Sequence, residues 1–423
     1  MIANAWVEVW GKRICKGMGT FLIILALVEP IAFATLKLFY LLYPLLYQRA
    51  DNLAVGNEML SRDGILDHKA FARELNALYY QKVKFHPYRS FLLPENYIGQ
   101  YVVTDAQGFR IDRRAINTES DKIGFFGGST MFSLTKQDGA IPQIINAKLD
   151  RSKAQALNFG VGAYSSTNEL ITFIEVLRTE KNLKYAVFYD GVNEYIMYTY
   201  KLTDHFEYTH FNVLGYFYPQ SVLPAMNNLI RQTTFQYEPY VLRLIKQFRE
   251  LVSPERVPYS FYRVNLILSP GTVDQHAEII ASIYLQNVHD IVALAKSRGV
   301  VPVFFWQPDI FTTRKPLTAR ELAIRERHPS LRILSQAVSR KVSSSEYLRD
   351  VLFFNIADTF DSLDQRDQFL DFCHVTEEAN RVVAERMVVQ LRSLTPAEYW
   401  NIRSVQANDL VGQIVHDALS VRK

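Results

Sequence analysis

The chain contains very little cysteine and no long run of basic residues. Its two cysteines, Cys15 and Cys373, match no metal-site spacing and no disulfide framework. Lys and Arg number 47 against 43 Asp and Glu, and no basic block or stripe favours nucleic acid as a partner. The phosphate-binding patterns G-x-G-x-x-G and G-x-x-x-x-G-K-[ST] are missing around the glycine-rich turn at 127–130, which argues against a nucleotide-binding domain. The sequence therefore predicts no cofactor and no metal site.

The composition is that of a folded protein, and the pattern of apolar runs predicts an α/β fold. With 48% hydrophobic and 21% charged residues, the 423-residue chain can bury a large core. From residue 122 onward, short apolar runs alternate with helical patterns, which is typical of parallel strands joined by crossover helices. We expect a three-layer α/β/α domain with a five-stranded parallel sheet in flavodoxin-like order. The predicted strands are 123–126, 156–161, 185–191, 300–308 and 351–357, and the predicted helices are 141–149, 166–178, 279–297, 318–342 (broken near Pro329) and 376–391.

The predicted domain organisation has five parts. They are a membrane anchor (1–47), an extended and helical lead-in (48–121), the α/β domain (122–394), an insertion within it (195–275) and a C-terminal tail (395–423). In the insertion, 16 of the 68 residues from 195 to 262 are Phe or Tyr. These side chains could pack the insertion itself, sit at a membrane interface, or contact a sugar ring or an acyl chain.

The N-terminal sequence predicts export and attachment to a membrane. Lys12, Arg13 and Lys16 precede the mostly apolar stretch 17–36, which has the length of about 20 residues that spans a bilayer. Basic residues on the N-terminal side predict a cytoplasmic N-terminus and an extracytoplasmic (periplasmic) remainder. The small residues around 32–34 also fit a cleavable signal peptide. We favour a single-pass anchor because apolar sequence continues past that cleavage point, and both readings export the rest of the chain.

Polar or glycine-rich segments follow four of the predicted strands. They are GGST (127–130), NFGVGAYSS (158–166), DGVNE (190–194) and LDFCHVT (370–376). Parallel strands bring their carboxyl ends to one edge of the sheet, where open α/β sheets bind ligands. Ester hydrolysis needs a hydroxyl nucleophile, a base, a group that orients the base, and donors for the oxyanion. Because two glycines allow a very tight turn, Ser129 would stand exposed at this edge and is the candidate nucleophile.

In this order the four segments resemble the sequence blocks of the SGNH hydrolase superfamily, also called GDSL-like esterases. GGST stands where the first block of that family carries its serine, and NFGVGAYS resembles the second block. GVNE resembles the third block, and DFCH resembles the fifth, which is an Asp-x-x-His pair. The resemblance covers about residues 122–392. The residues that make up these blocks are similar to those of an exported, membrane-anchored branch of the family that is associated with cell-surface polysaccharides.

The resemblance assigns roles to individual residues. It implies a catalytic triad in which Ser129 is the nucleophile, His374 is the base and Asp371 orients the base. The oxyanion hole would consist of the backbone N–H groups of Ser129 and Ala163 and the side-chain amide of Asn193.

Two departures from the family pattern keep the functional interpretation open. Gly128 stands where the family has Asp before the serine, and Ala163 stands where it has a glycine. Our main hypothesis is an exported, membrane-tethered serine esterase that removes O-acyl groups, in particular O-acetyl groups, from a carbohydrate. If a sugar hydroxyl replaced water, the same site would act as an O-acetyltransferase in the modification of a cell-surface polysaccharide.

A non-catalytic glycan-binding component of polysaccharide assembly is the alternative from another class. The expected partners are an acylated carbohydrate, the membrane and proteins of polysaccharide biosynthesis, and no nucleic acid. Cys373 and Glu194 are both expected to be structural.

Overall fold

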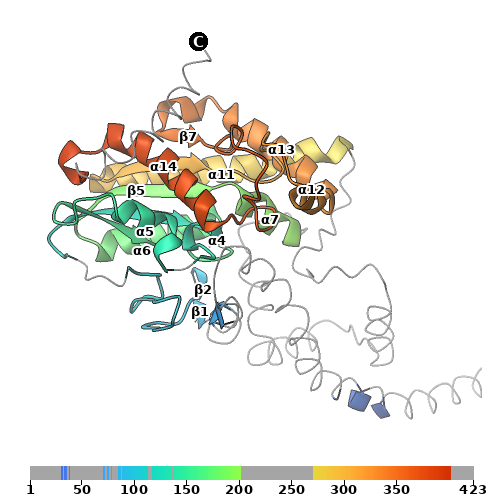
Figure 1. Cartoon of the computed structure of the whole chain (residues 1–423), viewed down its shortest axis with the longest axis horizontal. Coiled ribbons are helices and arrows are strands. Elements are labelled where there is room, and N and C mark those ends of the chain that lie inside the picture. The colour runs from blue at the N-terminus through green and yellow to red at the C-terminus, as the bar shows by residue number, and fades with distance from the viewer. Residues whose placement is uncertain are drawn as a thin grey trace, which may run out of the picture. The chain divides into compact units, whose positions relative to one another are not determined.

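The computed structural model describes residues 84–86, 88–112, 117–135, 137–201 and 270–401, together with single positions between 30 and 78 (Figure 1). The chain divides into two compact units, Met1–Gly56 with Tyr218–Phe261 and Asn57–Phe217 with Tyr262–Lys423. The helices and strands discussed below all belong to the second unit.

Two predicted segments lie wholly or largely outside the described residues. They are the stretch 17–36 of the anchor and the part of the insertion from 202 to 269. Among the residues that the structure describes, no helix combines the length and the apolar character needed to cross a membrane.

The predicted strands and helices occur in the predicted order. The strands are β1 (Lys84–His86), β2 (Ser90–Leu92), β3 (Asp121–Gly127), β4 (Ala154–Asn158), β5 (Leu183–Asp190), β6 (Val301–Trp306) and β7 (Phe353–Asn355). The α-helices are α4 (Ser129–Phe132), α5 (Ile141–Asn146), α6 (Ser166–Thr179), α7 (Val192–Lys201), α11 (Pro270–Arg298), α12 (Ala319–Glu326), α13 (Pro329–Ser343) and α14 (Glu377–Leu394). To the predicted elements the structure adds β1, β2, α4 and α7.

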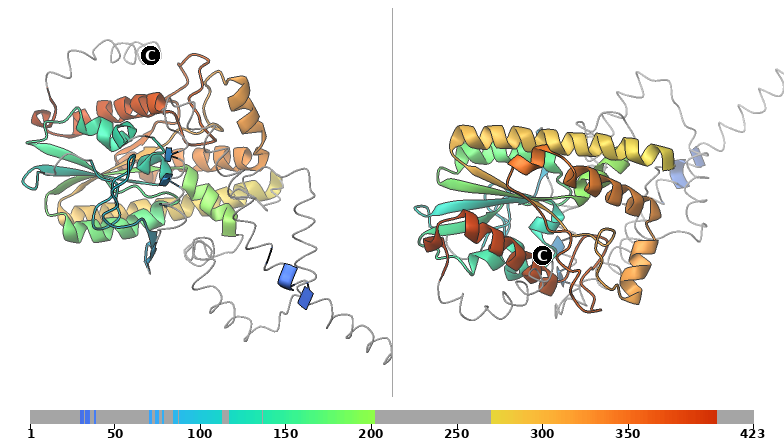
Figure 2. Two further views of the ribbon diagram at one scale, coloured as in Figure 1. Left: turned by 60° about the horizontal axis from the view of Figure 1, so that its bottom comes forward. Right: turned by 90° about the horizontal axis from the view of Figure 1, so that it is seen from above.

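Five of the strands form one parallel sheet in the order β4-β3-β5-β6-β7. The first strand of the domain lies between the second and the third, and later strands are added on one side only. Helices α6 and α11 cover one face of the sheet, and α5 and α14 cover the other (Figure 2). The prediction of a three-layer α/β/α domain with a five-stranded parallel sheet in flavodoxin-like order is therefore confirmed. The antiparallel hairpin of β1 and β2 belongs to the lead-in.

The centre of the sheet is packed by aromatic rings from neighbouring strands. Phe126, Phe188 and Phe304 stack across β3, β5 and β6 with ring centroids 4.9 Å and 5.1 Å apart, and all three are fully buried. Strands covered by helices on both faces have continuous apolar sequence, as these have. The burial of each such ring contributes about 1.5–3 kcal/mol to the stability of the fold. The stable sheet holds the loops at its edge in place.

Helix ends follow local sequence signals. The break predicted near Pro329 is present, because α12 ends at Glu326 and Pro329 starts α13. Thr318 and Thr376 cap α12 and α14 by accepting backbone N–H groups with their side chains. Gly299 ends α11 in the left-handed region, with φ of 67°.

Strands β4, β6 and β7 are shorter than predicted, and in β4 and β7 an asparagine side chain ends the strand. β4 stops at Asn158, three residues early, where the Asn158 side chain accepts the N–H of Gly160 at 2.9 Å. β7 stops at Asn355, whose side chain accepts the N–H of Ala357 at 3.0 Å. An asparagine that bonds the backbone two residues ahead turns the chain out of the sheet.

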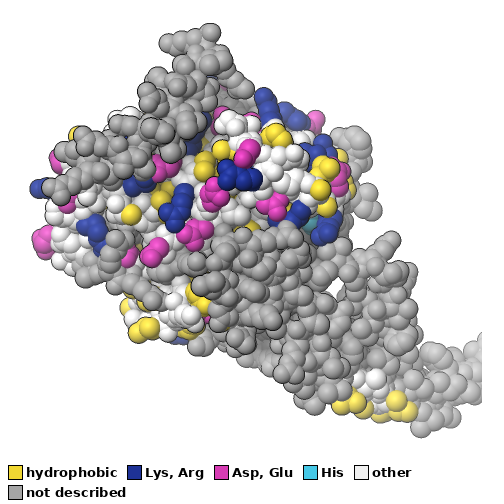
Figure 3. All heavy atoms as spheres, viewed as in Figure 1, with side chains coloured by type: hydrophobic (Ala, Val, Ile, Leu, Met, Phe, Trp, Pro, Cys, Tyr) yellow, Lys and Arg dark blue, Asp and Glu magenta, His cyan; other side chains and the backbone are white. Residues whose placement is uncertain are grey.

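Residues 395–401 of the predicted tail pack onto the domain. The N–H of Asn401 donates to the carbonyl of Lys148 at 2.9 Å, and Trp400 is buried. Residues 402–423 lie outside the described part of the chain, and the predicted domain boundaries stay predictions. On the described surface visible in Figure 3, acidic and basic side chains are interspersed, as the balanced charge of the sequence leads one to expect.

Candidate active site

Ser129 stands at the sharp turn that follows β3. The strand ends at Gly127, and the single helical turn α4 begins at Ser129 itself. A Cβ atom on Gly127 would lie 2.6 Å from Met131 Cβ, and one on Gly160 would lie 2.6 Å from the backbone nitrogen of Phe132. Because both contacts would be too close for any side chain, glycine is required for this turn and for the approach of the loop after β4.

The structure brings Ser129, His374 and Asp371 together in one hydrogen-bonded chain. His374 Nε2 lies 2.7 Å from Ser129 Oγ, and His374 Nδ1 lies 2.6 Å from Asp371 Oδ2. The other carboxylate oxygen, Asp371 Oδ1, accepts the backbone N–H groups of Cys373 at 2.8 Å and of His374 at 2.7 Å. When Nδ1 donates to Asp371, Nε2 is an acceptor for the hydroxyl proton of Ser129.

The charge of Asp371 is maintained by its surroundings. Burial alone would raise the pKa of Asp371, but the charge of His374 and the hydrogen bonds from the imidazole and two backbone N–H groups outweigh it. The pKa of Asp371 therefore lies below its usual range, and the group is ionised at neutral pH. An ionised carboxylate here can stabilise the imidazolium that forms when His374 takes a proton.

Cys373 lies between Asp371 and His374 in the sequence, but its thiol is not activated as a nucleophile. Burial raises the pKa of its thiol, and the charges of Asp371 and Asp309 raise it further. A protonated, buried thiol is a poor nucleophile, which agrees with the structural role predicted for Cys373. Asp371, Cys373 and His374 are also the one group in the described part of the chain whose ligand atoms lie close enough to hold a metal ion. A cation there would have to break the hydrogen bond between His374 Nδ1 and Asp371.

Two backbone N–H groups are available where the sequence places the oxyanion hole. Among the described residues, neither the N–H of Ser129 nor that of Ala163 donates to a protein acceptor. Ala163 has φ of 65°, in the left-handed region that glycine adopts easily and alanine does not. The position at which the family has glycine therefore keeps the glycine conformation in this chain, with alanine in its place.

Asn193 explains the other departure from the family pattern, which is Gly128. Its Nδ2 donates to the carbonyl oxygen of Tyr164 at 2.6 Å, which leaves its other N–H for a ligand. A Cβ atom on Gly128 would lie only 2.0 Å from Asn193 Nδ2 and 3.0 Å from that same carbonyl oxygen. An aspartate at position 128 would have to displace the amide of Asn193. Glycine is therefore needed at position 128 for Asn193 to lie where it does.

Replacing Ala163 by glycine should stabilise the protein by about 0.5–1 kcal/mol. The left-handed conformation costs an alanine about 1–2 kcal/mol, and part of the gain is cancelled by the greater freedom of glycine in the unfolded chain. The free energy of unfolding, measured by denaturant titration, checks this. As a control, Ala147→Gly changes an exposed alanine with φ of −68° and should lower the stability. A loss of stability in Ala163→Gly would contradict the strain that we infer.

Arg110, in the predicted lead-in, fixes the end of the helix that carries the nucleophile. The side chain is fully buried, and its two Nη atoms donate to the carbonyl oxygens of Phe132, Ser133 and Thr135 at 2.7–2.9 Å. A cation is favourable at the carbonyl end of a helix, so Arg110 supports the turn that starts at Ser129. This role could not be predicted from the sequence, because the short segment 108–110 (GFR) carries no signal of its partners.

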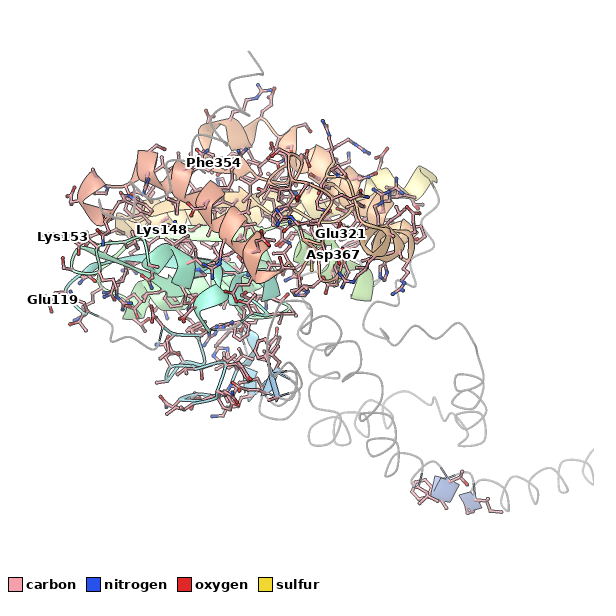
Figure 4. The ribbon with its side chains drawn as sticks, in the orientation of Figure 1. Glu119, Lys148, Lys153, Glu321, Phe354 and Asp367 are labelled. Atoms are coloured by element: carbon pink, nitrogen blue, oxygen red, sulfur yellow. The ribbon has the colours of Figure 1, made fainter. Side chains whose placement is uncertain are left out.

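Helix α12 holds the segment that leads into the Asp-x-x-His pair. Arg320 donates to the carbonyl oxygens of Phe369 and Leu370 at 2.9 and 2.7 Å, and Glu321 Oε1 accepts the N–H groups of Gln368 and Phe369. Figure 4 shows Glu321 beside this segment. Neither residue belongs to the four sequence segments, although the Thr-x-x-Glu capping pattern at the start of α12 can be recognised in the sequence.

A further polar contact links the nucleophile turn to the end of β6. Thr130 Oγ1 donates to Gln307 Oε1 at 2.7 Å, and the N–H of Gln307 donates to the carbonyl of Asp190 at 2.8 Å. The carboxyl ends of β3, β5 and β6 are thus joined beside Ser129. The role of Gln307 was not predicted from the sequence either, because Gln307 lies outside the four segments that resemble the family blocks.

No family model matches the sequence, and no curated protein matches it either. Solved structures similar to the chain include a putative lipolytic protein of the G-D-S-L family from Desulfitobacterium hafniense, with 10% identity over 64% of this chain and 99% of that one (TM-score 0.34). An aryl esterase of M. smegmatis shows 13% identity over 65% and 100% (TM-score 0.34). A catalytic mutant of an acetylxylan esterase from Geobacillus stearothermophilus shows 11% identity over 66% and 96% (TM-score 0.33). These likenesses are distant, and the case for a function rests on the geometry of the site.

Proposed function

We propose that the chain is a serine esterase of the SGNH type that removes O-acyl groups, in particular O-acetyl groups, from a carbohydrate. The observation that supports this most strongly is the imidazole of His374, which bonds Ser129 Oγ with one nitrogen and Asp371 with the other. This arrangement provides a nucleophile, a base and an orienting carboxylate in the geometry that acyl transfer requires.

The reaction would proceed in two steps. His374 Nε2 takes the hydroxyl proton while Ser129 Oγ attacks the acyl carbonyl, and the negative oxygen is stabilised by the N–H groups of Ser129 and Ala163 and the amide of Asn193. The sugar alcohol leaves with the proton from His374, and the acyl group stays on Ser129. Water, deprotonated by His374, then attacks the acyl-enzyme. The bond between the acyl carbon and Ser129 Oγ breaks, His374 returns the proton to Ser129 Oγ, and the acid is released.

Export, membrane attachment and the carbohydrate are the finer parts of the proposal. Export and attachment are supported by the basic residues before the apolar stretch 17–36. The carbohydrate is supported by the resemblance of the four sequence blocks to the branch associated with cell-surface polysaccharides. Gly128 provides the space that the Asn193 side chain occupies. The glycine therefore no longer favours a non-catalytic role, as one of the two departures from the family pattern.

The purified full-length chain should release p-nitrophenol from p-nitrophenyl acetate and should react once with a fluorophosphonate probe. The Ser129 oxygen would displace fluoride from phosphorus, and mass spectrometry would locate the adduct on Ser129. Ser129→Ala should carry no label. Labelling of a different residue would overturn Ser129 as the nucleophile. No label, together with no turnover of the ester or of an acetylated glycan, would favour the glycan-binding alternative. With an acetylated glycan, acetate in solution indicates an esterase, and acetate on an added sugar acceptor indicates a transferase.

A further inference from the structure

Glu194 connects the two segments that carry the oxyanion donors. It follows Asn193 in the first turn of α7 and is only 1% exposed. Glu194 Oε1 accepts the backbone N–H of Ser166 at 2.9 Å, and Oε2 accepts the Ser166 hydroxyl at 2.8 Å. Ser166 begins α6, three residues after Ala163. One carboxyl group therefore ties the loop that contains Ala163 to the helix that contains Asn193.

Neighbouring contacts hold the same loop. Asn193 Nδ2 donates to the carbonyl of Tyr164 at 2.6 Å, and Asn287 Nδ2, from α11, donates to Ser166 Oγ at 2.8 Å. The loop contains Ala163 in the left-handed conformation, which persists in an alanine only when the surroundings impose it. The Tyr164 N–H donates to the carbonyl of Val161 at 3.1 Å and closes the turn that contains Ala163, and the bonds to residues 164 and 166 fix the position of that turn.

Glu194 is part of a buried group of acidic side chains. The titratable groups that face it are Glu169 from α6, Asp190 from the end of β5 and Tyr284 from α11, and each of them is at most 4% exposed. Burial raises the pKa of Glu194 to about 8, and the charge of Asp190 adds to the shift. Burial also raises the pKa values of Glu169 and Asp190.

The buried group cannot be fully ionised. Glu169 Oε2 and Asp190 Oδ1 have no hydrogen-bond donor among the described residues, and a proton on Glu169 directed at Asp190 would satisfy both oxygens. Adding a third carboxyl group at Glu194 costs stability, and Glu194 does not touch the triad. At this unfavourable buried position, the carboxyl group of Glu194 accepts two hydrogen bonds from Ser166.

We propose that Glu194 is a positioning residue of the oxyanion hole, which fixes the Ala163 N–H and the Asn193 amide relative to one another by accepting two hydrogen bonds from Ser166. The inference rests on the proposed esterase function. Hydrogen-bond donors that are fixed in position before the reaction stabilise the transition state more than the bound substrate. Loosening the oxyanion donors should therefore lower kcat more than it changes KM.

Glu194→Ala should lower kcat for p-nitrophenyl acetate by about 10²-fold and change KM by less than about threefold. Glu194→Gln keeps an acceptor for the Ser166 N–H and should recover most of the loss. Glu169→Gln is the matched control, because it alters a buried carboxyl group of the same cluster that does not bond residues 163–166. Equal effects of Glu194→Ala and Glu169→Gln would overturn the proposal.

A double-mutant cycle tests whether Glu194 acts through the oxyanion donors. In an Asn193→Ala background, Glu194→Ala should lower kcat much less than in the wild-type chain, because one of the donors that it positions is already gone. Strictly additive effects would show that Glu194 acts elsewhere and would overturn the proposal. If Glu194→Ala does not fold, Ser166→Ala keeps the backbone N–H bond to Glu194 and removes the hydroxyl bonds to Glu194 and Asn287. It should show a smaller loss with the same dependence on Asn193.

Amide hydrogen exchange gives a measurement that does not depend on turnover. Exchange over residues 163–168 should be faster in Glu194→Ala than in the wild-type chain and unchanged in Glu169→Gln. Exchange that is insensitive to Glu194 overturns the positioning role, even in an active enzyme. A wild-type chain that shows no turnover dependent on Ser129 overturns the proposed function instead, so the two failures can be told apart.

Discussion

Replacing Asp371 by asparagine should lower kcat by about 10⁴-fold while the fold stays intact. Asp371 Oδ1 accepts the backbone N–H groups of Cys373 and His374, so the amide oxygen of an asparagine must occupy that side. Its NH₂ group then faces His374 Nδ1 and donates to it. The imidazole must carry its own proton on Nε2, where it can no longer accept the hydroxyl proton of Ser129.

Steady-state hydrolysis of p-nitrophenyl acetate measures this effect, and circular dichroism checks the fold. Asp364→Asn is a suitable control, because Asp364 is exposed in the same segment and pairs only with the exposed Arg366 among the described residues. Its kcat should match that of the wild-type chain. If Asp371→Asn kept kcat within about tenfold of wild type, the tautomer of His374 would not be what Asp371 controls.

The sequence was sufficient to predict the sheet and the residues at its edge. Alternating apolar runs and helical patterns imply parallel strands, and parallel strands bring their carboxyl ends together. Ser129, Asn193 and the pair Asp371 and His374 each follow a different strand, and the structure places Ser129, Asp371 and His374 in direct contact. Strand order predicts that these segments meet at one edge, and the resemblance of the segments to the SGNH blocks is what assigned roles to Ser129, Asp371 and His374.

The residues that hold the site in place could not be read from the sequence. Arg110 bonds carbonyl groups 22 to 25 residues away, and Glu321 bonds backbone groups 47 and 48 residues away. Such contacts depend on how loops pack against one another, which periodicity and spacing do not describe. The φ of Ala163 is a similar case, because tertiary contacts impose it against the preference of the residue.

Replacing Glu321 by glutamine should lower the free energy of unfolding by about 3–5 kcal/mol. Glu321 Oε2 lies 2.6 Å from Lys315 Nζ, and both side chains are fully shielded from solvent. Oε2 also accepts the N–H of Thr318, and Oε1 accepts those of Gln368 and Phe369. A glutamine offers a single acceptor oxygen, so several buried donors would lose their acceptor. The charged amine of Lys315 would lose its counter-charge and keep only the carbonyl oxygen of Pro316 at 3.1 Å.

Urea denaturation measures this loss, and a second substitution separates the charge from the other bonds. Adding Lys315→Met to Glu321→Gln removes the unpaired charge and should recover about 1–4 kcal/mol, whereas Glu326→Gln, exposed on the same helix, should cost less than about 1 kcal/mol. A single variant as stable as the wild-type chain would contradict the role of this pair. A double variant with restored stability but a low kcat would show that the bonds to residues 368 and 369 position Asp371, which lies two residues after Phe369.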